Sequence, residues 1–255
     1  SGLDADILLR NADIALYRAK EQGRNTYQFY TEGMQEREVM RLELEKDLSQ
    51  ALANNEFVLY YQPQLNLKSG EINSVEALIR WQHPRRGLLP PAAFIPLAEE
   101  SGRIADIGRW VVMAACRQLA AWKGTRFESF TVAVNLCGRE LDDENLVERI
   151  RDALEAKDIP ANRLEVELTE EIFIQNIEHN LDQLTRLHEL GVHLAIDDFG
   201  VGYSSLAYLR DFPVDILKID RSFITEITER HDDAVITRAV INLAHNLGLR
   251  VVAEG

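Results

Sequence analysis

Predicted strands and helices alternate along most of the chain, and this alternation limits the fold more than any other feature. Short runs rich in Val, Ile and Leu are separated by longer stretches in which apolar residues recur at helical spacing. The predicted strands are Phe57–Gln62, Ile72–Trp81, Thr131–Leu136, Leu164–Thr169, His193–Asp197, Ile216–Ile219 and Arg250–Ala253. The predicted helices between them are Ala105–Trp122, Leu146–Ala156, Ile177–Leu190 and Asp232–Leu247. Because helical crossovers join parallel strands, the pattern predicts an α/β fold with a parallel sheet.

The connection between the first two strands breaks this pattern. Only nine residues separate Gln62 from Ile72. A parallel crossover needs about a dozen residues or more, so these two strands are predicted to pair antiparallel. A closed α/β barrel has eight strands in about 250 residues; seven are predicted here, and the sequence ends at Gly255, just after the seventh. We therefore expect a TIM-like (β/α)8 barrel with an antiparallel first strand, and with the eighth strand missing from this chain.

The first 53 residues follow a different pattern. Apolar residues at helical spacing predict a helix over residues 5–19, followed by a short strand at Thr26–Tyr30. One helix and one strand cannot bury a core, so residues 1–31 are expected to be an appendage or the tail of another domain. A charged helix over residues 35–53 is expected to connect this segment with the barrel, which gives three units: 1–31, 32–53 and 54–255.

The charge balance excludes several classes of partner. The chain has 42 acidic residues against 28 Lys and Arg, a formal net charge of −14. This argues against binding to nucleic-acid polymers and against a polybasic membrane-surface module. An anionic ligand would need something other than net charge to hold it, and a metal ion is the first candidate. Two cysteines are too few for a disulfide framework, which favours a cytoplasmic setting, and no apolar run approaches the roughly 18 residues of a membrane span.

Polar side chains gather at the carboxyl ends of the predicted strands, where α/β barrels build their active sites. In chain order they are Glu76, Arg80, Asn135, Glu165, Glu167, Glu170, Asp197, Asp198, Lys218, Asp220 and Glu254. A carboxylate within a buried strand costs several kcal/mol unless it is paired or bound to a metal. Carboxylate and amide oxygens suit Mg²⁺ or Mn²⁺. The adjacent Asp197 and Asp198 would let one carboxylate bridge two ions about 3.5–4 Å apart.

Each of these features also has an ordinary structural explanation when it is taken alone. A single Glu in a strand is often exposed, Lys218 fits a surface position on an edge strand, and Asp197-Asp198 before Phe-Gly fits a turn with a helix cap. The Gly-rich loop over residues 198–206 lacks the Lys-Ser/Thr of a Walker phosphate loop, and it fits either a mobile segment or a tight connection to a helix near Ser204. Independent explanations would not place polar residues at five successive strand ends, and the set together favours a metal site.

Several motifs resemble those of EAL-domain cyclic-di-GMP phosphodiesterases. Glu76-Ala-Leu78 matches the family signature, and supporting motifs follow in the family order from about residue 35 to residue 255. They are Tyr61-Gln-Pro63, Pro91-Ala-Ala-Phe-Ile-Pro-Leu-Ala-Glu99, Val134-Asn-Leu136, Glu167-Leu-Thr-Glu170, Asp197-Asp-Phe-Gly-Val-Gly-Tyr-Ser-Ser-Leu206, Leu217-Lys-Ile-Asp220 and Val252-Ala-Glu-Gly255. Residues 4–30 resemble the C-terminal end of a GGDEF (diguanylate cyclase-like) domain, so the parent protein resembles a tandem GGDEF–EAL protein.

The resemblance implies hydrolysis of cyclic di-GMP to linear pGpG with two Mg²⁺ or Mn²⁺ ions, in bacterial second-messenger signalling. It implies that Glu76, Asn135, Glu167 and Asp197 bind one ion, and that Asp197 and Asp198 bind the second. It further implies that Lys218 orients the attacking water, that Glu254 is another essential glutamate, and that Glu170 steadies the Gly-rich loop. Gln62 and Arg80 match substrate-binding positions, and Asp220 is expected to join them.

The resemblance also leaves alternatives. Some family members have lost metal ligands and act as non-catalytic cyclic-di-GMP receptors, whereas every ligand position that can be compared is filled here, which favours the enzyme. A metal phosphodiesterase for another cyclic dinucleotide is a third alternative. Val201 and Cys137 stand where the family often has Thr and Ser, and neither change removes a ligand. A homodimer and upstream GGDEF and sensor domains are expected, and any membrane anchor would belong to the parent protein and not to this segment.

Overall fold

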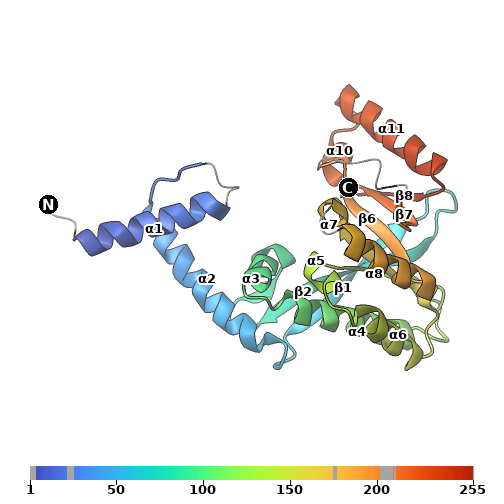
Figure 1. Cartoon of the computed structure of the whole chain (residues 1–255), viewed down its shortest axis with the longest axis horizontal. Helices are drawn as coiled ribbons and strands as arrows, with labels where there is room; N and C mark the ends of the chain where they lie inside the picture. Colours follow the sequence, from blue (N-terminus) through green and yellow to red (C-terminus); the bar gives the residue numbers. More distant parts are fainter. Residues whose placement is uncertain (1–3, 22–25, 175–176, 202–208, 210, 255) are drawn as a thin grey trace.

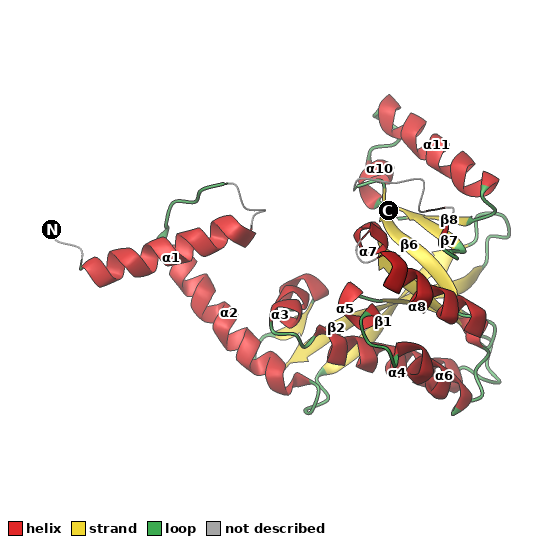
Figure 2. Cartoon of the chain, in the orientation of Figure 1, coloured by secondary structure: helices red, strands yellow, loops and turns green. Residues whose placement is uncertain are grey.

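An open, curled β-sheet with helices on its outer face forms most of the molecule (Figures 1 and 2). The computed structural model describes residues 4–21, 26–174, 177–201, 209 and 211–254. The strands are β1 (Phe57–Leu65), β2 (Ile72–His83), β3 (Gly87–Leu89), β4 (Thr131–Asn135), β5 (Leu164–Thr169), β6 (His193–Phe199), β7 (Ile216–Ile219) and β8 (Arg250–Ala253). The longer helices beside them are α4 (Ile104–Ala121), α6 (Leu146–Glu155), α8 (Ile177–Leu190) and α11 (His231–Asn246). The predicted alternation of strands and helices is confirmed.

The predicted antiparallel start of the sheet is also confirmed. The strand order is β1-β2-β4-β5-β6-β7-β8; β1 pairs antiparallel with β2, and each later neighbour in this order is parallel. The turn between β1 and β2 is closed by Asn66, whose Oδ1 accepts hydrogen bonds from the backbone N–H groups of Lys68 and Ser69. Gly70 follows with a φ of 73°, a conformation that glycine adopts without strain. The short loop therefore reverses the chain where a helical crossover would not fit.

The sheet is a TIM-like half-barrel. Among the described residues, β1 and β8 form its two edges and do not pair with each other. The structure also contains a short strand, β3, which the sequence analysis does not predict. It pairs with β2 in a hairpin and lies outside the strand order of the half-barrel. Short helices also lie in the connections, outside the predicted elements: α3 (Ile95–Glu100), α5 (Gly138–Leu141), α7 (Glu170–Ile174), α10 (Arg221–Thr225), and the 3-10 turns Pro91–Ala93 and Ala161–Arg163.

The two faces of the sheet differ in chemistry, and β2 shows how. Val75, Ala77 and Trp81 are buried on the face that meets the helices. Trp81 and Phe57 pack there with ring centroids 5.9 Å apart. Because side chains alternate between faces along a strand, Glu76 points to the inner, concave face. The apolar core thus lies between the sheet and its helices, and the concave face is left for polar groups.

The N-terminal segment forms an arm that Figure 1 shows extending away from the barrel. It consists of α1 (Ala5–Glu21) and α2 (Glu32–Ala51), and α2 reaches the core through the buried Leu48 and Ala51 at its end. The predicted strand at Thr26–Tyr30 is wrong, because these residues have no strand structure. A strand forms by pairing with a neighbouring strand, and the described sheet does not include these residues. No described helix is both long and apolar enough to cross a membrane.

The connection after β4 is held by a capping box with cysteine in the place of the usual Ser or Thr. The Cys137 side chain accepts a hydrogen bond from the Glu140 backbone N–H, and Glu140 Oε2 accepts one from the Cys137 N–H at 3.0 Å. Burial raises the pKa of the Glu140 carboxyl to about 7. The carboxyl lies against Gly108 of α4, where a Cβ atom would collide with Oε1. This contact fixes the segment that follows Asn135.

Replacing Glu140 with glutamine should raise the unfolding free energy of the metal-free protein, relative to that of the wild type, by more at high pH than at low pH. A glutamate whose pKa is raised by folding stabilises the fold below its ordinary value of 4.5, and this contribution is lost as the pH rises through about 7. The shift corresponds to about 3 kcal/mol. The amide oxygen of glutamine still accepts from Cys137 but carries no charge. Urea unfolding in EDTA should give a difference in unfolding free energy that grows between about pH 5 and about pH 8. A difference in unfolding free energy that does not change with pH would contradict this prediction. The same pH dependence in Glu155→Gln, the control at an exposed glutamate, would contradict it as well.

Candidate active site

The ammonium group of Lys218 lies inside a cluster of carboxylates on the concave face. Its Nζ is 2.7 Å from Glu254 Oε1, 2.8 Å from Glu167 Oε2, 3.0 Å from Asp197 Oδ1 and 3.6 Å from Glu76 Oε2. These residues come from β2, β5, β6, β7 and the position after β8, which meet because parallel strands end at one rim. Lys218 is only 1% exposed and Glu167 is fully buried. The alternative that Lys218 is a surface residue is therefore wrong.

The predicted amide ligand and two of the three predicted substrate-binding residues lie along the same face. Asn135 Nδ2 donates a hydrogen bond to Glu76 Oε1 at 2.9 Å. Gln62 is the register partner of Glu76 across β1 and β2, and directly opposite residues of an antiparallel pair point to the same face. Arg80 lies four residues after Glu76 in β2, so it shares that face by alternation. The structure thus places Asn135 and Gln62 next to Glu76, and Arg80 further along the same face.

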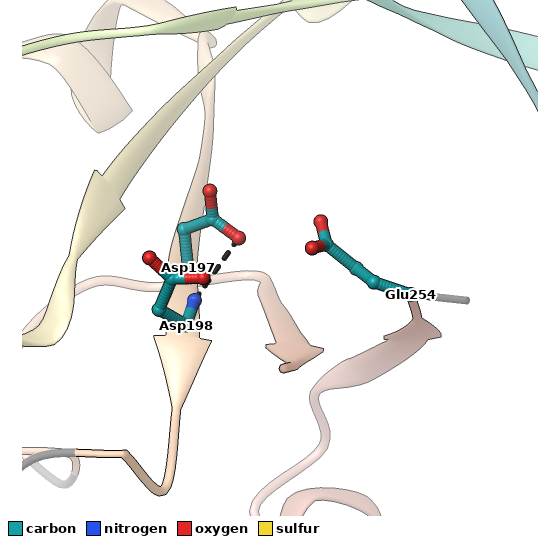
Figure 3. Close-up of side chains that lie close together, drawn as sticks. All are labelled: Asp197, Asp198 and Glu254. Atoms are coloured by element: carbon teal, nitrogen blue, oxygen red, sulfur yellow. Dashed lines mark hydrogen bonds between the residues drawn. The ribbon is translucent and has the colours of Figure 1, made fainter. Parts of the chain in front are cut away.

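Two adjacent aspartates reach this rim because β6 is irregular at its end. The pairing of β6 with β7 shifts register between Ile196 and Phe199, and Asp198 has a φ of 54°. Neighbouring residues of a regular strand point to opposite faces, and this left-handed residue breaks the alternation. The Asp198 N–H donates to Asp197 Oδ1 at 3.0 Å. Figure 3 shows Glu254 reaching toward the pair, and one oxygen from each of the three carboxylates lies within 4.8 Å of the others.

Burial and crowding of like charges shift the pKa values of these groups. Burial raises the pKa of Glu167 well above its ordinary value, and Glu76 adds to the rise. Burial, with Asp197 next to it, raises the pKa of Asp198, and burial raises that of Glu254. Burial alone would lower the pKa of Lys218, but the carboxylates around it outweigh burial and raise it. One ammonium therefore faces an excess of acidic groups.

The donor set fits divalent cations. Glu167 Oε1 is buried and has no hydrogen-bond partner in the described part of the chain. A buried carboxylate oxygen without a donor is destabilising, and a cation would satisfy it. The side-chain oxygens of Glu76, Asn135, Asp197 and Asp198 at the same rim are hard ligands of the kind that Mg²⁺ and Mn²⁺ prefer.

Asp220 and Glu170 lie beside the cluster and contact its supporting segments. Asp220 caps α10: its Oδ1 accepts from the Ser222 N–H at 2.9 Å and from the Ser222 hydroxyl, and these bonds lower its pKa. The Asp198 carboxyl lies near enough to Asp220 to lower its pKa further. The Glu170 carboxylate contacts the start of the Gly-rich loop, where its Oε2 accepts from the Gly200 N–H at 3.3 Å. The rest of this loop, with the proposed helix start near Ser204, lies outside the described residues.

Two residues on the concave face have no role in the sequence prediction. Glu165 is buried two residues before Glu167; its Oε1 has no partner among the described residues, and burial raises its pKa to about 7. Tyr60 lies two residues before Gln62 and is half-exposed. Glu165 already stands among the polar residues at the predicted strand ends, whereas the face that Tyr60 occupies is shown by the register of β1 with β2.

The family model described as the EAL domain matches residues 45–255, which is most of the chain. The chain belongs to the EAL domain family. Its signature tripeptide lies in the middle of β2, where Ala77 is packed against the core while Glu76 points to the concave face.

Relatives with an EAL domain include proteins of named activity. The cyclic di-GMP phosphodiesterase NbdA of Pseudomonas aeruginosa is 46% identical over 254 residues, and the match covers 100% of this chain and 32% of NbdA. The cyclic di-GMP phosphodiesterase PdeR of Escherichia coli is 40% identical over 254 residues, covering 100% of this chain and 38% of PdeR. The chain thus spans about a third of the length of these curated relatives.

Solved EAL structures share the fold. The c-di-GMP complex of the PaMucR phosphodiesterase superposes with a TM-score of 0.80 at 42% identity, and the match covers 84% of this chain and 86% of that chain. The FimX EAL domain from Pseudomonas aeruginosa bound to c-di-GMP superposes with a TM-score of 0.76 at 26% identity, over 83% and 84% of the two chains. The half-barrel therefore has the arrangement of known EAL domains.

Proposed function

We propose that this EAL domain hydrolyses cyclic di-GMP to linear pGpG. The buried Lys218 ammonium, surrounded by carboxylates from several strand ends, is the observation that carries the proposal. The relatives named above as cyclic di-GMP phosphodiesterases and the c-di-GMP complex of PaMucR support the substrate. In this proposal an acidic chain binds an anionic substrate because its carboxylates hold divalent cations. These cations neutralise the charge of the carboxylates and that of the substrate phosphates.

Each predicted site residue has a role in this proposal. Glu76, Asn135, Glu167 and Asp197 would hold one ion, and Asp197 and Asp198 the second. When bound, two Mg²⁺ or Mn²⁺ ions supply charge neutralisation at the phosphodiester and a water of lowered pKa. Lys218 positions that water and stabilises developing negative charge, while Glu254 holds the Lys218 ammonium at 2.7 Å.

The remaining residues hold the substrate and the Gly-rich loop. Gln62 and Arg80 bind the dinucleotide on the concave face. Asp220 supports this side of the site through its contact with Asp198. Glu170 steadies the start of the loop through the Gly200 N–H. Gly200 is suited to this contact because its φ is 101° and a Cβ atom there would meet Phe223 at 3.0 Å.

The proposal predicts turnover of cyclic di-GMP in Mg²⁺ or Mn²⁺, measured as pGpG by chromatography, and none in EDTA. Glu76→Ala should lower kcat/KM by more than about a hundredfold, because it removes a metal ligand and the partner of Asn135. The matched control is Glu71→Ala, at an exposed glutamate just before β2, which should keep wild-type activity. Tight binding of the dinucleotide without pGpG in either metal would overturn the enzyme and favour a receptor. Faster turnover of another cyclic dinucleotide would favour the third alternative.

For the parent protein we propose a tandem GGDEF–EAL arrangement in the cytoplasm. Residues 1–31 would be the end of the GGDEF domain, 32–53 the connector with the first EAL helix, and 54–255 the phosphodiesterase barrel. Support comes from α1, whose Ile7, Leu9 and Leu16 side chains are exposed, because another domain would cover apolar side chains of this kind. Upstream sensor domains and a homodimer complete the proposal. Light scattering of the protein over a range of concentrations tests the dimer.

A further inference from the structure

A half-exposed tyrosine lies on the face of the sheet that carries the substrate-binding residues. Tyr60 in β1 is directly opposite Leu78 in β2, and the equivalent pair two residues further along β1 is Gln62 opposite Glu76. Opposite residues of an antiparallel pair share a face, and residues two apart along a strand share it too. Tyr60 therefore shares the concave face with Gln62 and Glu76.

The sheet core does not need the Tyr60 ring. Its neighbour Tyr61 has the opposite orientation and packs against Trp122, with ring centroids 5.7 Å apart. Burial raises the pKa of the Tyr61 hydroxyl to about 12. Tyr60, by contrast, is 49% exposed. A large aromatic side chain that faces a binding surface and not the core is available for a ligand.

A guanidinium group lies beside this ring. Arg80 Cζ is 5.8 Å from the centroid of the Tyr60 ring. Arg80 Nη1 donates to the Ile79 carbonyl at 2.9 Å, and Arg80 forms no ion pair within the described ranges of the chain. An aromatic ring next to an arginine is a typical nucleotide-binding arrangement, because the ring stacks on a base while the guanidinium binds a phosphate.

We propose that Tyr60 stacks on one guanine base of the dinucleotide while Arg80 binds the adjacent phosphate. This inference rests on the proposed function and extends it from the phosphodiester to the base. The carboxylates around Lys218 suit cations that hold a phosphate, and they offer no apolar surface to a purine. A half-exposed ring on the same face supplies that surface, which makes Tyr60 a determinant of affinity for the nucleotide.

The test replaces the ring by an apolar side chain. Tyr60→Leu should raise KM for cyclic di-GMP about ten- to a hundredfold, because stacking of one base on an aromatic ring has an effect of this size. The kcat at saturation and the affinity for Mn²⁺, titrated calorimetrically, should stay within about twofold of the wild type. Tyr60→Phe keeps the ring and should restore KM. The matched control is Tyr27→Leu, at an exposed tyrosine of the N-terminal arm, which should change nothing.

A second measurement separates this inference from the proposed function. Calorimetric titration of cyclic di-GMP in EDTA measures binding where no metal-dependent hydrolysis occurs. If the wild type cleaves the dinucleotide but Tyr60→Leu keeps wild-type KM and Kd, the stacking inference alone is overturned. It is also overturned if Tyr60→Phe loses as much affinity as Tyr60→Leu, or if Tyr60→Leu lowers only the unfolding free energy. If the wild type binds cyclic di-GMP but does not cleave it in Mg²⁺ or Mn²⁺, the proposed function fails. The stacking inference is still supported in that case if Tyr60→Leu weakens the Kd for cyclic di-GMP and Tyr60→Phe restores it.

Discussion

Replacing Lys218 with methionine is expected to destabilise the metal-free protein more than any surface change. Methionine matches the length of the lysine and fills the buried space, but it leaves the carboxylates of Glu167, Asp197 and Glu254 without their cation. Removing one partner of a buried ion pair typically costs about 3–5 kcal/mol, because the remaining charge is left uncompensated. Hydrolysis of cyclic di-GMP should fall about a thousandfold, because the proposed function assigns Lys218 to position the attacking water.

The pH dependence of this loss identifies its cause. Burial raises the pKa values of Glu167 and Glu254, so both carboxyls take up protons in the folded state more readily than in the unfolded chain. A raised carboxyl pKa stabilises the fold at low pH, and that contribution is lost as the pH rises. The Lys218 ammonium partly offsets this rise by lowering both pKa values, so Lys218→Met raises them further. The destabilisation in Lys218→Met should therefore be larger at about pH 8 than at about pH 5, by urea unfolding in EDTA.

Addition of Mn²⁺ provides a further check on the lysine. The cation should stabilise Lys218→Met more than the wild type, because it supplies the missing positive charge. The control is Lys123→Met, which removes an exposed ion pair with Asp158 (3.0 Å) and should change the unfolding free energy by less than about 1 kcal/mol. Equal metal-free stability of Lys218→Met and the wild type at about pH 8 would show that the ammonium does not balance these carboxylates.

The residues of the site could be predicted from the sequence because parallel strands deliver their ends to one rim. Glu76, Glu167 and Lys218 lie in three strands that the hydrophobic pattern already predicts, and the topology alone brings them together. The nine-residue loop before Ile72 was enough to predict the antiparallel start. These inferences succeed because each depends on connection length or strand direction, which the order of elements determines.

Other features depend on tertiary contacts that no local pattern encodes. The left-handed Asp198 belongs to a shift in the pairing of β6 with β7, so the strand pattern alone does not show how two adjacent aspartates share a rim. Thr26–Tyr30 has the composition of a strand, but it lacks a partner strand and forms none. Tyr60 does not stand out in the sequence because an aromatic residue in a strand usually indicates core packing, and the register with β2 shows which face it occupies.

Some residues of the candidate active site destabilise the fold when no metal is bound. Asp198 adopts a φ of 54°, a conformation that is unfavourable for most side chains and that asparagine tolerates well. Its pKa is raised by burial, by Asp197 and by Asp220, so its negative charge is disfavoured where it stands. Such local conflict is typical of residues retained for chemistry and not for stability.

Asp198→Asn should therefore stabilise the metal-free protein while it abolishes most of the activity. Asparagine suits the left-handed backbone and removes one negative charge from the cluster. Its amide N–H can also donate a hydrogen bond to Asp220. The unfolding free energy in EDTA should therefore rise by about 1 kcal/mol. In the proposed site the variant replaces a charged carboxylate ligand of the second ion by a neutral amide, an effect of several kcal/mol on the transition state, so kcat/KM in Mn²⁺ should fall about a thousandfold.

Asp158→Asn is the matched control, because Asp158 also has a left-handed backbone (φ of 49°) but lies on the surface beside Lys123. It shares the backbone preference and lacks the carboxylate cluster, so it should show at most a small gain in stability and wild-type turnover. Wild-type activity of Asp198→Asn would exclude Asp198 as a metal ligand. Loss of metal-free stability in Asp198→Asn would contradict the crowding of charge at this rim, because relief of that crowding is the source of the expected gain.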